Sequence, residues 1–296
     1  MSQNDVQKMN PQGVSYKTYD TAWCPGCGDF GILSSLKNAL EELQLDPHQV
    51  VFAGGIGQAA KTPQYITGNR FCGLHGRSIP AAVAAKIAND DLTVIINTGD
   101  GDGFAEGGNH FLAAVRRNVN ITHFAHDNQV YGLTLGQASP TSLHGYVTGS
   151  QPYGYLSIPF NPVATALILG AGFVARGYAG DPEQLAELMK AAIRFDGYAL
   201  VDIFQPCVSF NKVNTYSWYK ERVRPLTAEH DPTDFEQALK AALTFENADG
   251  AGIPTGILYN VEKPTYKAQH EVLQRGPLLQ QGATREFIQE QIGKLA

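Results

Sequence analysis

Long hydrophobic runs and clusters of positive charge are both missing from this sequence of 296 residues. No stretch approaches the roughly 18 consecutive apolar residues that a membrane-spanning helix needs. The first residues also lack the charged-then-apolar pattern of a signal peptide. No basic run exceeds two residues and the formal net charge is -6, so nucleic-acid binding has no electrostatic basis. We therefore expect a cytoplasmic protein that binds neither membranes nor nucleic acids.

Charged residues are also scarce, at 17% of the chain, against roughly 25% in an average soluble protein. Glycine is abundant instead, with 31 residues. This combination indicates extensive buried surface and close backbone approaches, and it favours a tightly assembled subunit over a free monomer. An ordinary compact enzyme could have the same composition, so this evidence leaves both open.

Cysteine is limited to four residues, Cys24, Cys27, Cys72 and Cys207. Disulfides are rare in cytosolic proteins, so metal binding or redox chemistry is the better interpretation. Cys24 and Cys27 form a C-x-x-C motif ahead of the first predicted helix. Such a motif occurs in thioredoxin-like redox pairs, in zinc sites and in iron–sulfur sites. Residues 14–23 make a poor strand, which disfavours the thioredoxin-like pair.

Short apolar runs alternate with helical patterns along most of the chain. This alternation predicts an α/β fold with a doubly wound, mostly parallel sheet. We expect an extended arm over residues 1–20, a main domain over residues 1–225 and a C-terminal extension over 226–296 that contacts another subunit. Strands are predicted over residues 49–54, 92–98, 120–126, 173–178 and 198–204. Helices are predicted over residues 32–43, 78–89, 104–116, 162–169 and 182–195, with Asp181 as the N-cap of the last.

The unusual residues follow the predicted strands, and ligands bind at that edge of a doubly wound sheet. They are Gly55-Ile56-Gly57, Gly99-Asp100-Gly101, Asp127-Asn128 and Cys207. Asp100 and Asn128 offer the hard oxygen ligands that Mg²⁺ prefers, while Gly99 and Gly101 let the backbone approach a phosphate. A lone Gly-Asp-Gly is most often only a turn. Its position after an apolar strand, with Asn at the end of the next strand, is far more specific.

At this point the chain resembles the thiamine-diphosphate enzymes, whose cofactor motif runs from Gly-Asp-Gly to Asn. The resemblance implies that Mg²⁺ is held by the side chains of Asp100 and Asn128 and by the carbonyl of Val130. It also implies a cofactor pocket. Its expected lining residues are Gly57, His75, Gly99, Asp100, Gly101, Asp102, Asn128, Leu133 and Thr134.

Several further motifs resemble the β subunits of the 2-oxoacid:ferredoxin oxidoreductases, and the resemblance covers roughly residues 12–225. The motifs are Trp23-Cys24-Pro25-Gly26-Cys27-Gly28, Leu74-His75-Gly76-Arg77, Val130-Tyr131-Gly132-Leu133-Thr134, Gly136-Gln137-Ala138-Ser139-Pro140-Thr141 and Gln205-Pro206-Cys207. The branch acting on 2-oxoglutarate is favoured, with pyruvate as the alternative. Family resemblance places His75 against the cofactor in an active-site role, although a lone histidine is more often structural. Lys61 could meet the far carboxylate of the substrate or could be a solvated surface lysine.

The resemblance also implies a [4Fe–4S] cluster, and the chain departs from the family at one of its ligands. The family's third cysteine usually sits in the Gly-x-Gly loop after the first strand, and here that loop reads Gly55-Ile56-Gly57-Gln58. Since four cysteines match the four thiolates of such a cluster, we expect Cys24, Cys27, Cys72 and Cys207 to be its ligands. The other reading makes Cys72 a small buried residue and leaves the fourth ligand to a non-thiolate group or another chain.

The resemblance implies oxidative decarboxylation of a 2-oxoacid, reversible toward carboxylation of CO2. Thiamine diphosphate carries the chemistry, the cluster passes electrons to ferredoxin, and coenzyme A takes the acyl group. An α subunit with the pyrimidine-binding domain would supply the activating glutamate, and a dimer of heterodimers is expected. Two alternatives are a non-oxidative or flavin-linked thiamine enzyme, such as a relative of acetolactate synthase, and a zinc-stabilised scaffold subunit. The first normally has a chain about twice as long without the C-x-x-C, and iron and sulfide analysis would distinguish the second.

Overall fold

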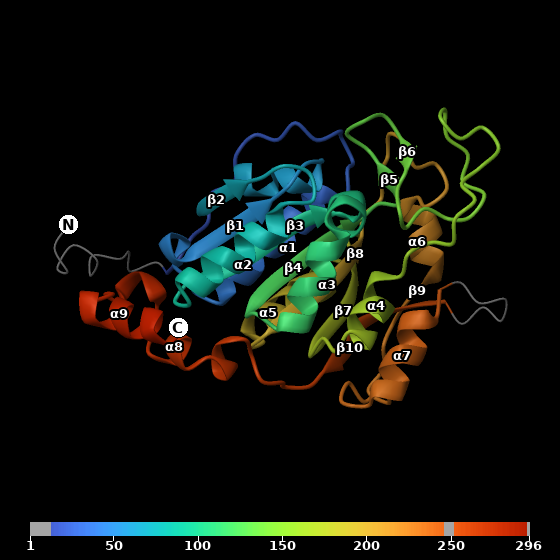
Figure 1. Ribbon diagram of the computed structural model, residues 1–296. Coiled ribbons are helices and arrows are strands. Elements are labelled where there is room, and N and C mark those ends of the chain that lie inside the picture. Colours follow the sequence, from blue (N-terminus) through green and yellow to red (C-terminus); the bar gives the residue numbers. More distant parts are fainter. Residues whose placement is uncertain (1–12, 246–251, 295–296) are drawn as a thin grey trace.

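A three-layered α/β/α sandwich is built around one eight-stranded sheet (Figure 1). The computed structural model describes residues 13–245 and 252–294. The strand order is β2-β1-β3-β4-β8-β7-β10-β9, and only the β7–β10 pair is antiparallel. The strands of the sheet are β1 (Val50–Gly54), β2 (Asn69–Cys72), β3 (Thr93–Gly99), β4 (Ile121–Asp127), β7 (Phe173–Tyr178), β8 (Tyr198–Phe204), β9 (Val223–Pro225) and β10 (Ile253–Asn260). The predicted doubly wound, mostly parallel sheet is therefore confirmed.

Helices cover both faces of the sheet. The helices are α1 (Asp29–Glu42), α2 (Ser78–Ala88), α3 (Gly108–Arg117), α4 (Pro162–Ile168), α5 (Pro182–Arg194), α6 (Tyr216–Arg222), α7 (Phe235–Leu243), α8 (Glu271–Gln274) and α9 (Arg285–Gly293). Short turns of helix are η1 (Pro47–Gln49), η2 (Ala59–Gln64), η3 (Gly101–Glu106), η4 (Lys267–Gln269) and η5 (Leu278–Gln280), and β5 (Val130–Tyr131) pairs with β6 (Gln137–Ala138). The strands and helices predicted from the sequence are all present, and Asp181 caps α5 through the backbone N–H of Gln184.

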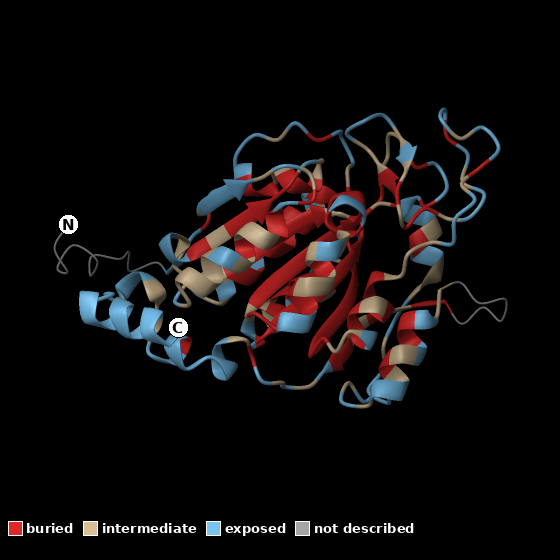
Figure 2. Cartoon of the chain, viewed as in Figure 1, coloured by how far each residue is buried: buried red, intermediate tan, exposed pale blue. Residues whose placement is uncertain are grey.

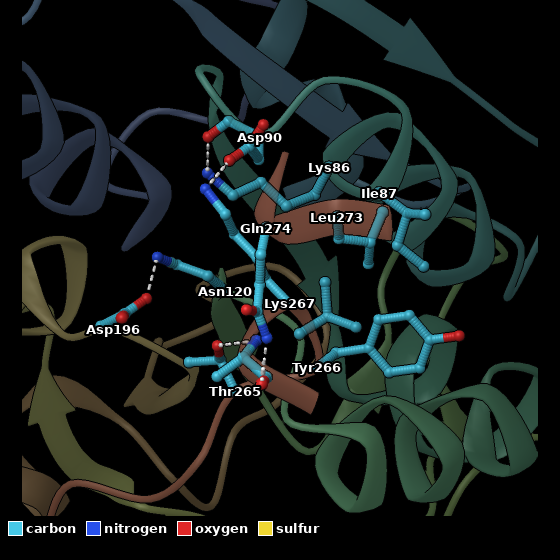
Figure 3. Close-up of a pocket in the computed structure, with 12 residues that line it drawn as sticks. Lys86, Ile87, Asp90, Asn120, Asp196, Thr265, Tyr266, Lys267, Leu273 and Gln274 are labelled. Carbon is cyan, nitrogen blue, oxygen red and sulfur yellow. Dashed lines mark hydrogen bonds and ion pairs between the residues drawn. The ribbon is translucent and has the colours of Figure 1, made fainter. Parts of the chain in front are cut away.

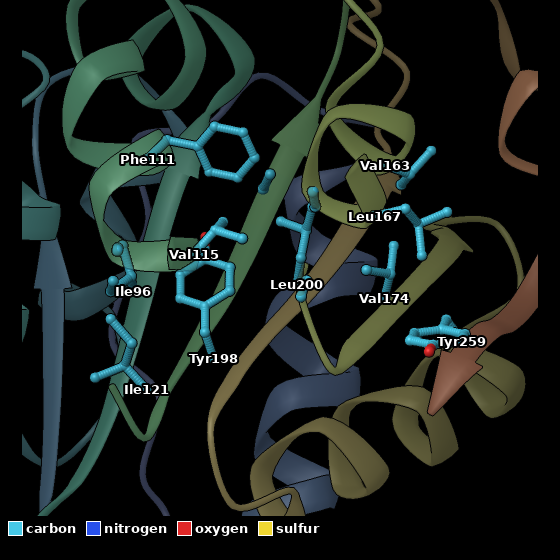
Figure 4. Close-up of a cluster of buried hydrophobic side chains, with 14 of the residues drawn as sticks. Ile96, Phe111, Val115, Ile121, Val163, Leu167, Val174, Tyr198, Leu200 and Tyr259 are labelled. Carbon is cyan, nitrogen blue, oxygen red and sulfur yellow. The ribbon is translucent and has the colours of Figure 1, made fainter. Parts of the chain in front are cut away.

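Alternate residues of each central strand belong to two different hydrophobic cores. On one face, α2, α3, α4 and α7 pack on side chains such as Ile96 and Leu200 (Figure 4). On the other face, α1 and α5 pack on side chains such as Ile95 and Val201. The central strands are buried on both sides (Figure 2), which explains why their sequences read as continuous apolar runs.

The helix predicted over residues 104–116 begins differently in the structure. Residues Gly101–Glu106 form a π-helical turn, in which the Gly107 N–H donates to the carbonyl of Asp102 at 3.0 Å. A Cβ on Gly103 would lie 2.6 Å from the Thr98 hydroxyl, and one on Gly107 would lie 2.6 Å from the Asp102 carbonyl. Glycine therefore permits this wide turn to pack tightly against β3. Single π-turns of this kind are frequent at functional sites.

The two ends of the described chain differ in how they contact the main sheet. Of the predicted N-terminal arm, residues 1–12 lie outside the described residues. The rest lies on the main domain, where the Tyr16 hydroxyl donates to the carbonyl of Leu45 at 2.9 Å and Thr18 bridges to Ile66. Beyond residue 225, β10 joins the main sheet while α8 and α9 lie at its periphery (Figure 1). The division at residue 225 stays a proposal. Within the described residues, no helix is both long and apolar enough to cross a bilayer.

Candidate active site

The carboxyl ends of β1, β3, β4 and β8 meet at one edge of the sheet. The strand register aligns Gly54 with Asn97, Gly99 with His126, and Asp127 with Phe204. A pocket of about 90 Å³ lies over this edge. Its lining includes Gly57, His75, Gly99, Asp100, Gly101, Asp102, Asn128, Val130, Leu133 and Thr134. The structure thus brings together all the residues predicted for the cofactor and for magnesium.

Asp100 lies at the base of this pocket, directly after β3. It is buried, and one carboxylate oxygen accepts hydrogen bonds from the hydroxyls of Ser139 and Thr141, the second at 2.6 Å. Burial raises the pKa of the Asp100 carboxyl, and the two hydroxyl donors oppose that rise. No lysine or arginine of the described residues lines this pocket. A buried carboxylate in such surroundings is stabilised by a divalent cation.

Asn128 is held in place from three sides. Its side-chain oxygen accepts from the Val130 N–H at 3.0 Å, and its amide nitrogen donates to the Gln205 side chain at 2.9 Å. The side chain of Asn211 donates to the Asn128 carbonyl at 3.0 Å. Asn128 and Val130 therefore lie in a fixed turn beside Asp100. Oxygens of these three residues fit the hard-ligand set that Mg²⁺ requires.

Two glycines leave open space in the pocket where a phosphate could lie. An added Cβ on Gly57 or on Gly99 would meet no atom within 4 Å. Gly57 also has a φ of 131°, which disfavours any residue with a side chain. Gly101 differs, because a Cβ there would collide with the ring of Tyr131 at 2.1 Å. The backbone of Gly57 and Gly99 is thus open within the pocket, as an anionic diphosphate would need once a cation balances the carboxylates.

Asp102 ties the loops of the pocket together. One of its oxygens accepts from the Ile56 N–H at 3.1 Å and from the Gly76 N–H at 2.7 Å. The His75 ring nitrogen Nε2 lies 3.7 Å from the same oxygen and 3.5 Å from a carboxylate oxygen of Glu106. The sequence indicated Asp102 only as a cofactor contact, whereas the structure shows that it also positions the His75 loop.

Sequence reasoning missed several residues of this edge. Ser139 and Thr141 belong to a motif that was recognised, but no contact with Asp100 was predicted for them. Tyr131 covers Gly101, and its hydroxyl donates to Glu106 at 3.2 Å. Behind Asp100, a pocket of about 170 Å³ is lined by buried Asp127, Arg176 and Asp202, among other residues. The sequence singled out Asp127 at a strand end but not Arg176 and Asp202, which lie inside predicted strands. The pairing of β4, β7 and β8 brings the three together.

Three of the four cysteines surround a second, smaller pocket of about 30 Å³. Cys24 and Cys27 come from the loop before α1, and Cys207 follows β8. The Ser209 hydroxyl lies 3.1 Å from the Cys24 sulfur, and the Gln205 amide nitrogen lies 3.3 Å from the Cys27 sulfur. Burial raises the pKa of the Cys27 thiol, and the nearby Asp29 carboxylate raises it further. Three convergent sulfurs with amide and hydroxyl donors suit an iron–sulfur cluster.

Cys72 and Lys61 are placed elsewhere. Cys72 is exposed at the end of β2, where its sulfur lies 3.8 Å from the Gln64 amide, and it does not line the cysteine pocket. Lys61 lies in η2 and lines neither pocket. In the part of the chain that the structure describes, no three His, Cys, Asp or Glu residues are grouped closely enough to hold a single metal ion. A magnesium site with one carboxylate ligand does not need three such residues in one group. An iron–sulfur site does not need them either, because its cysteines surround a larger cluster.

A larger cavity, of about 610 Å³, lies at the opposite, amino-terminal edge of the sheet (Figure 3). Lys86, from α2, donates to the carbonyls of Asp90 and Leu92 at 2.7 and 2.6 Å. Lys267 forms an ion pair with Asp90, and the Asn120 amide donates to Asp196 at 2.6 Å. None of the residues predicted to be functional lines this cavity.

Comparison with protein families agrees with this geometry. Residues 48–203 match the thiamine pyrophosphate enzyme C-terminal TPP-binding domain. Residues 207–275 match the C-terminal part of the pyruvate ferredoxin oxidoreductase β subunit. The fold and the pocket at the carboxyl edge therefore define a thiamine-diphosphate-binding domain.

Individual relatives show which family of thiamine-diphosphate-binding proteins the chain resembles. The chain is 42% identical to 2-oxoacid:ferredoxin oxidoreductase 2, subunit beta, of Aeropyrum pernix, over 93% of this chain and 92% of that protein. It is 46% identical to 2-oxoglutarate oxidoreductase subunit KorB of Mycobacterium tuberculosis, over 65% of this chain and 52% of that protein. A solved 2-oxoglutarate:ferredoxin oxidoreductase from Magnetococcus marinus superposes with a TM-score of 0.87 at 37% identity, covering 98% of this chain and 97% of that one. This chain belongs to the β subunits of the 2-oxoacid:ferredoxin oxidoreductases.

Proposed function

We propose that this chain, together with an α subunit, converts 2-oxoglutarate, coenzyme A and oxidised ferredoxin to succinyl-CoA, CO2 and reduced ferredoxin, in a reversible reaction. The observation that carries the proposal is the contact between two pockets. Gln58, Asn128 and Gly132 line both the pocket over Asp100 and the pocket among the three cysteines. A thiamine-bound substrate and an electron-accepting cluster would therefore be neighbours.

The choice of 2-oxoglutarate is supported by the relatives. The Mycobacterium tuberculosis KorB subunit is named for 2-oxoglutarate, and the Magnetococcus marinus structure was solved with 2-oxoglutarate, coenzyme A and succinyl-CoA bound. Pyruvate is the second candidate, because residues 207–275 match a family named for pyruvate.

Each residue of the pocket has a proposed task. Asp100, Asn128 and the Val130 carbonyl hold Mg²⁺, which balances the cofactor's diphosphate. The open backbone at Gly57 and Gly99, with Gly101 under the Tyr131 ring and Asp102 next to it, shapes the phosphate cradle, and Leu133 and Thr134 line the cofactor pocket. His75, kept in place beside Asp102, donates or accepts hydrogen bonds at the reacting end. Lys61 is proposed to pair with the far carboxylate of the substrate.

Bound thiamine diphosphate would supply the nucleophilic carbon and the electron sink, and an iron–sulfur cluster would take up electrons one at a time. Cys24, Cys27 and Cys207 are proposed to hold that cluster, and Cys72 stays the sequence-based prediction for its fourth ligand. No glutamate lines the pocket over Asp100 within the described residues. We therefore propose that the α subunit supplies the activating glutamate in a cytoplasmic dimer of heterodimers.

The test is turnover by the chain co-purified with its α subunit under anaerobic conditions. Ferredoxin reduction should depend on coenzyme A, and kcat/KM for 2-oxoglutarate should exceed that for pyruvate by about tenfold or more. A tenfold ratio is the minimum that we expect from one charge-assisted contact to the extra carboxylate of 2-oxoglutarate. The chain without its partner serves as the control and should show no turnover. A preference for pyruvate would mean that pyruvate, and not 2-oxoglutarate, is the substrate. Failure to release CO2 from any 2-oxoacid would refute the proposed reaction.

A further inference from the structure

Gln58 is one of the residues that line the cysteine pocket. The residues around this pocket include Cys24, Cys27, Cys207 and Gln58. The Trp23 indole N–H donates to the main-chain carbonyl of Gln58 at 3.0 Å, and Trp23 immediately precedes Cys24. This bond fastens the loop after β1 to the cysteine loop, so the position of Gln58 is fixed relative to the sulfurs.

The side-chain oxygen of Gln58 has no partner. It is buried, and no hydrogen-bond donor reaches it in the described structure. A buried acceptor without a donor is unfavourable, and such groups in folded proteins normally find a partner, a water molecule or an ion. Gln58 therefore carries a free acceptor oxygen, on a residue that lines both the cysteine pocket and the pocket over Asp100.

Cys72, in contrast to Gln58, is exposed and does not line the cysteine pocket. Its strand pairs with β1 so that Cys72 lies opposite Gly54, and the residue is exposed. Its sulfur faces Gln64, at the far end of η2 from Gln58. Cys72 is therefore not among the residues that line the pocket of the other three sulfurs.

We propose that the side-chain oxygen of Gln58, rather than a fourth thiolate, occupies the fourth corner of the [4Fe–4S] cluster. This inference rests on the proposed function, since it presumes that Cys24, Cys27 and Cys207 hold a cluster. An amide oxygen is neutral and hard, so it binds a cluster iron more weakly than a thiolate does. The iron next to Gln58 is consequently the one most easily lost.

The chemical consequence is a defined oxidation. A [4Fe–4S]²⁺ cluster gives one electron to an added oxidant such as ferricyanide, releases one Fe²⁺ and becomes [3Fe–4S]⁺. Only the bonds of the released iron to three sulfides and to the Gln58 oxygen break. The thiolates of Cys24, Cys27 and Cys207 stay bound to the remaining irons.

The experiment is a ferricyanide titration of the anaerobically purified complex with its α subunit. Free Fe²⁺ and the EPR signal of the three-iron cluster are the readouts. The wild type should release about one iron per cluster, and Gln58→Ala should release it at least as readily. Gln58→Cys should keep all its iron at the same oxidant concentration. Gln64→Ala, at the other end of η2, is the matched control and should titrate like the wild type.

Cys72→Ser separates the two candidates for the fourth ligand. If Gln58 is the ligand, Cys72→Ser should titrate like the wild type. If Cys72→Ser is purified as a three-iron form while Gln58→Ala keeps four irons, Cys72 is the ligand and the inference is overturned. A wild type as resistant as Gln58→Cys also overturns it. Absence of iron and sulfide from every variant would instead refute the proposed cluster itself.

Discussion

At the amino-terminal edge of the sheet, a cavity of about 610 Å³ is lined by Lys86, Asp90, Asn120 and Lys267, each of which has at least one hydrogen-bond or ion-pair partner. At the carboxyl-terminal edge the pocket is only about 90 Å³, but it combines bare glycine backbone with buried oxygens. Gln58 and Asp102 each keep one side-chain oxygen without a donor there. One oxygen of Asp90 is also unpartnered, yet the other is ion-paired. Between these two edges, polar groups left free for a ligand identify the functional site better than cavity volume does.

The largest effect on the comparison between the two edges is expected from Asp100→Ala, through the affinity for thiamine diphosphate. The substitution removes the charged ligand from the proposed magnesium site and leaves the diphosphate uncompensated. Thiamine diphosphate affinity should fall at least about a hundredfold, since even outer contacts to a metal site cost about 10–100-fold. Calorimetric titration with thiamine diphosphate and Mg²⁺ measures it. Affinity within a few-fold of wild type would remove the assignment of this edge as the cofactor site.

An intermediate effect, on the pH dependence of folding stability, is expected from the buried residue Asp202. Burial raises its pKa to about 7, although Arg176 opposes the shift. The unfolded chain releases this proton near pH 3.9, so the folded protein binds more protons between those values. Its stability should therefore fall as the pH rises from about 4 to about 7.

Asp202→Asn removes this titration, so the decline over that pH range should become shallower, by about 1–3 kcal/mol in total. Urea unfolding of the chain at a series of pH values measures it. Asp20→Asn, at an exposed position, is the control and should leave the slope as it is. An unaltered slope in Asp202→Asn would show that Asp202 is ionised throughout, and the burial argument would fail.

The smallest effect is expected at the amino-terminal edge, from Lys86→Met. Methionine keeps an apolar chain of similar length but loses the two hydrogen bonds to carbonyls. The free energy of unfolding should drop by about 1 kcal/mol, while thiamine diphosphate binding stays as in the wild type. Thermal unfolding and calorimetric titration on the same sample give both values. A marked loss of cofactor affinity would mean that the two edges are coupled.

The sequence predicted the parts of the fold that depend on local pattern. The central strands were recognised because they are buried on both faces, and α5 because Asp181 and Pro182 mark its start. β10 was missed, since Pro254 and Gly256 interrupt its pattern, and the structure has a bulge between Ile257 and Tyr259. β2 was missed because all four of its residues are exposed at the sheet edge, so its burial pattern carries no signal.

The same division applies to the candidate site. Asp100 and Asn128 could be predicted because each follows an apolar strand directly. The contact of Asp102 with Ile56, 46 residues away in the chain, could not, because it depends on how two loops fold over the sheet edge. The buried, unpartnered oxygen of Gln58 was equally invisible in the sequence. There Gln58 indicated only a missing cysteine, and Cys72 was the nearest substitute in the chain.

The antiparallel pairing of β7 with β10 has a consequence for how the chain is made. β7 is buried throughout, and one of its two edges is covered only by β10, which begins at Ile253. During synthesis, the residues between these strands leave the ribosome while that apolar edge has no partner. Unpaired edges of this kind recruit other chains. The newborn polypeptide is thus open to such pairing over this interval, and truncation before Ile253 would leave this edge of β7 without its partner strand.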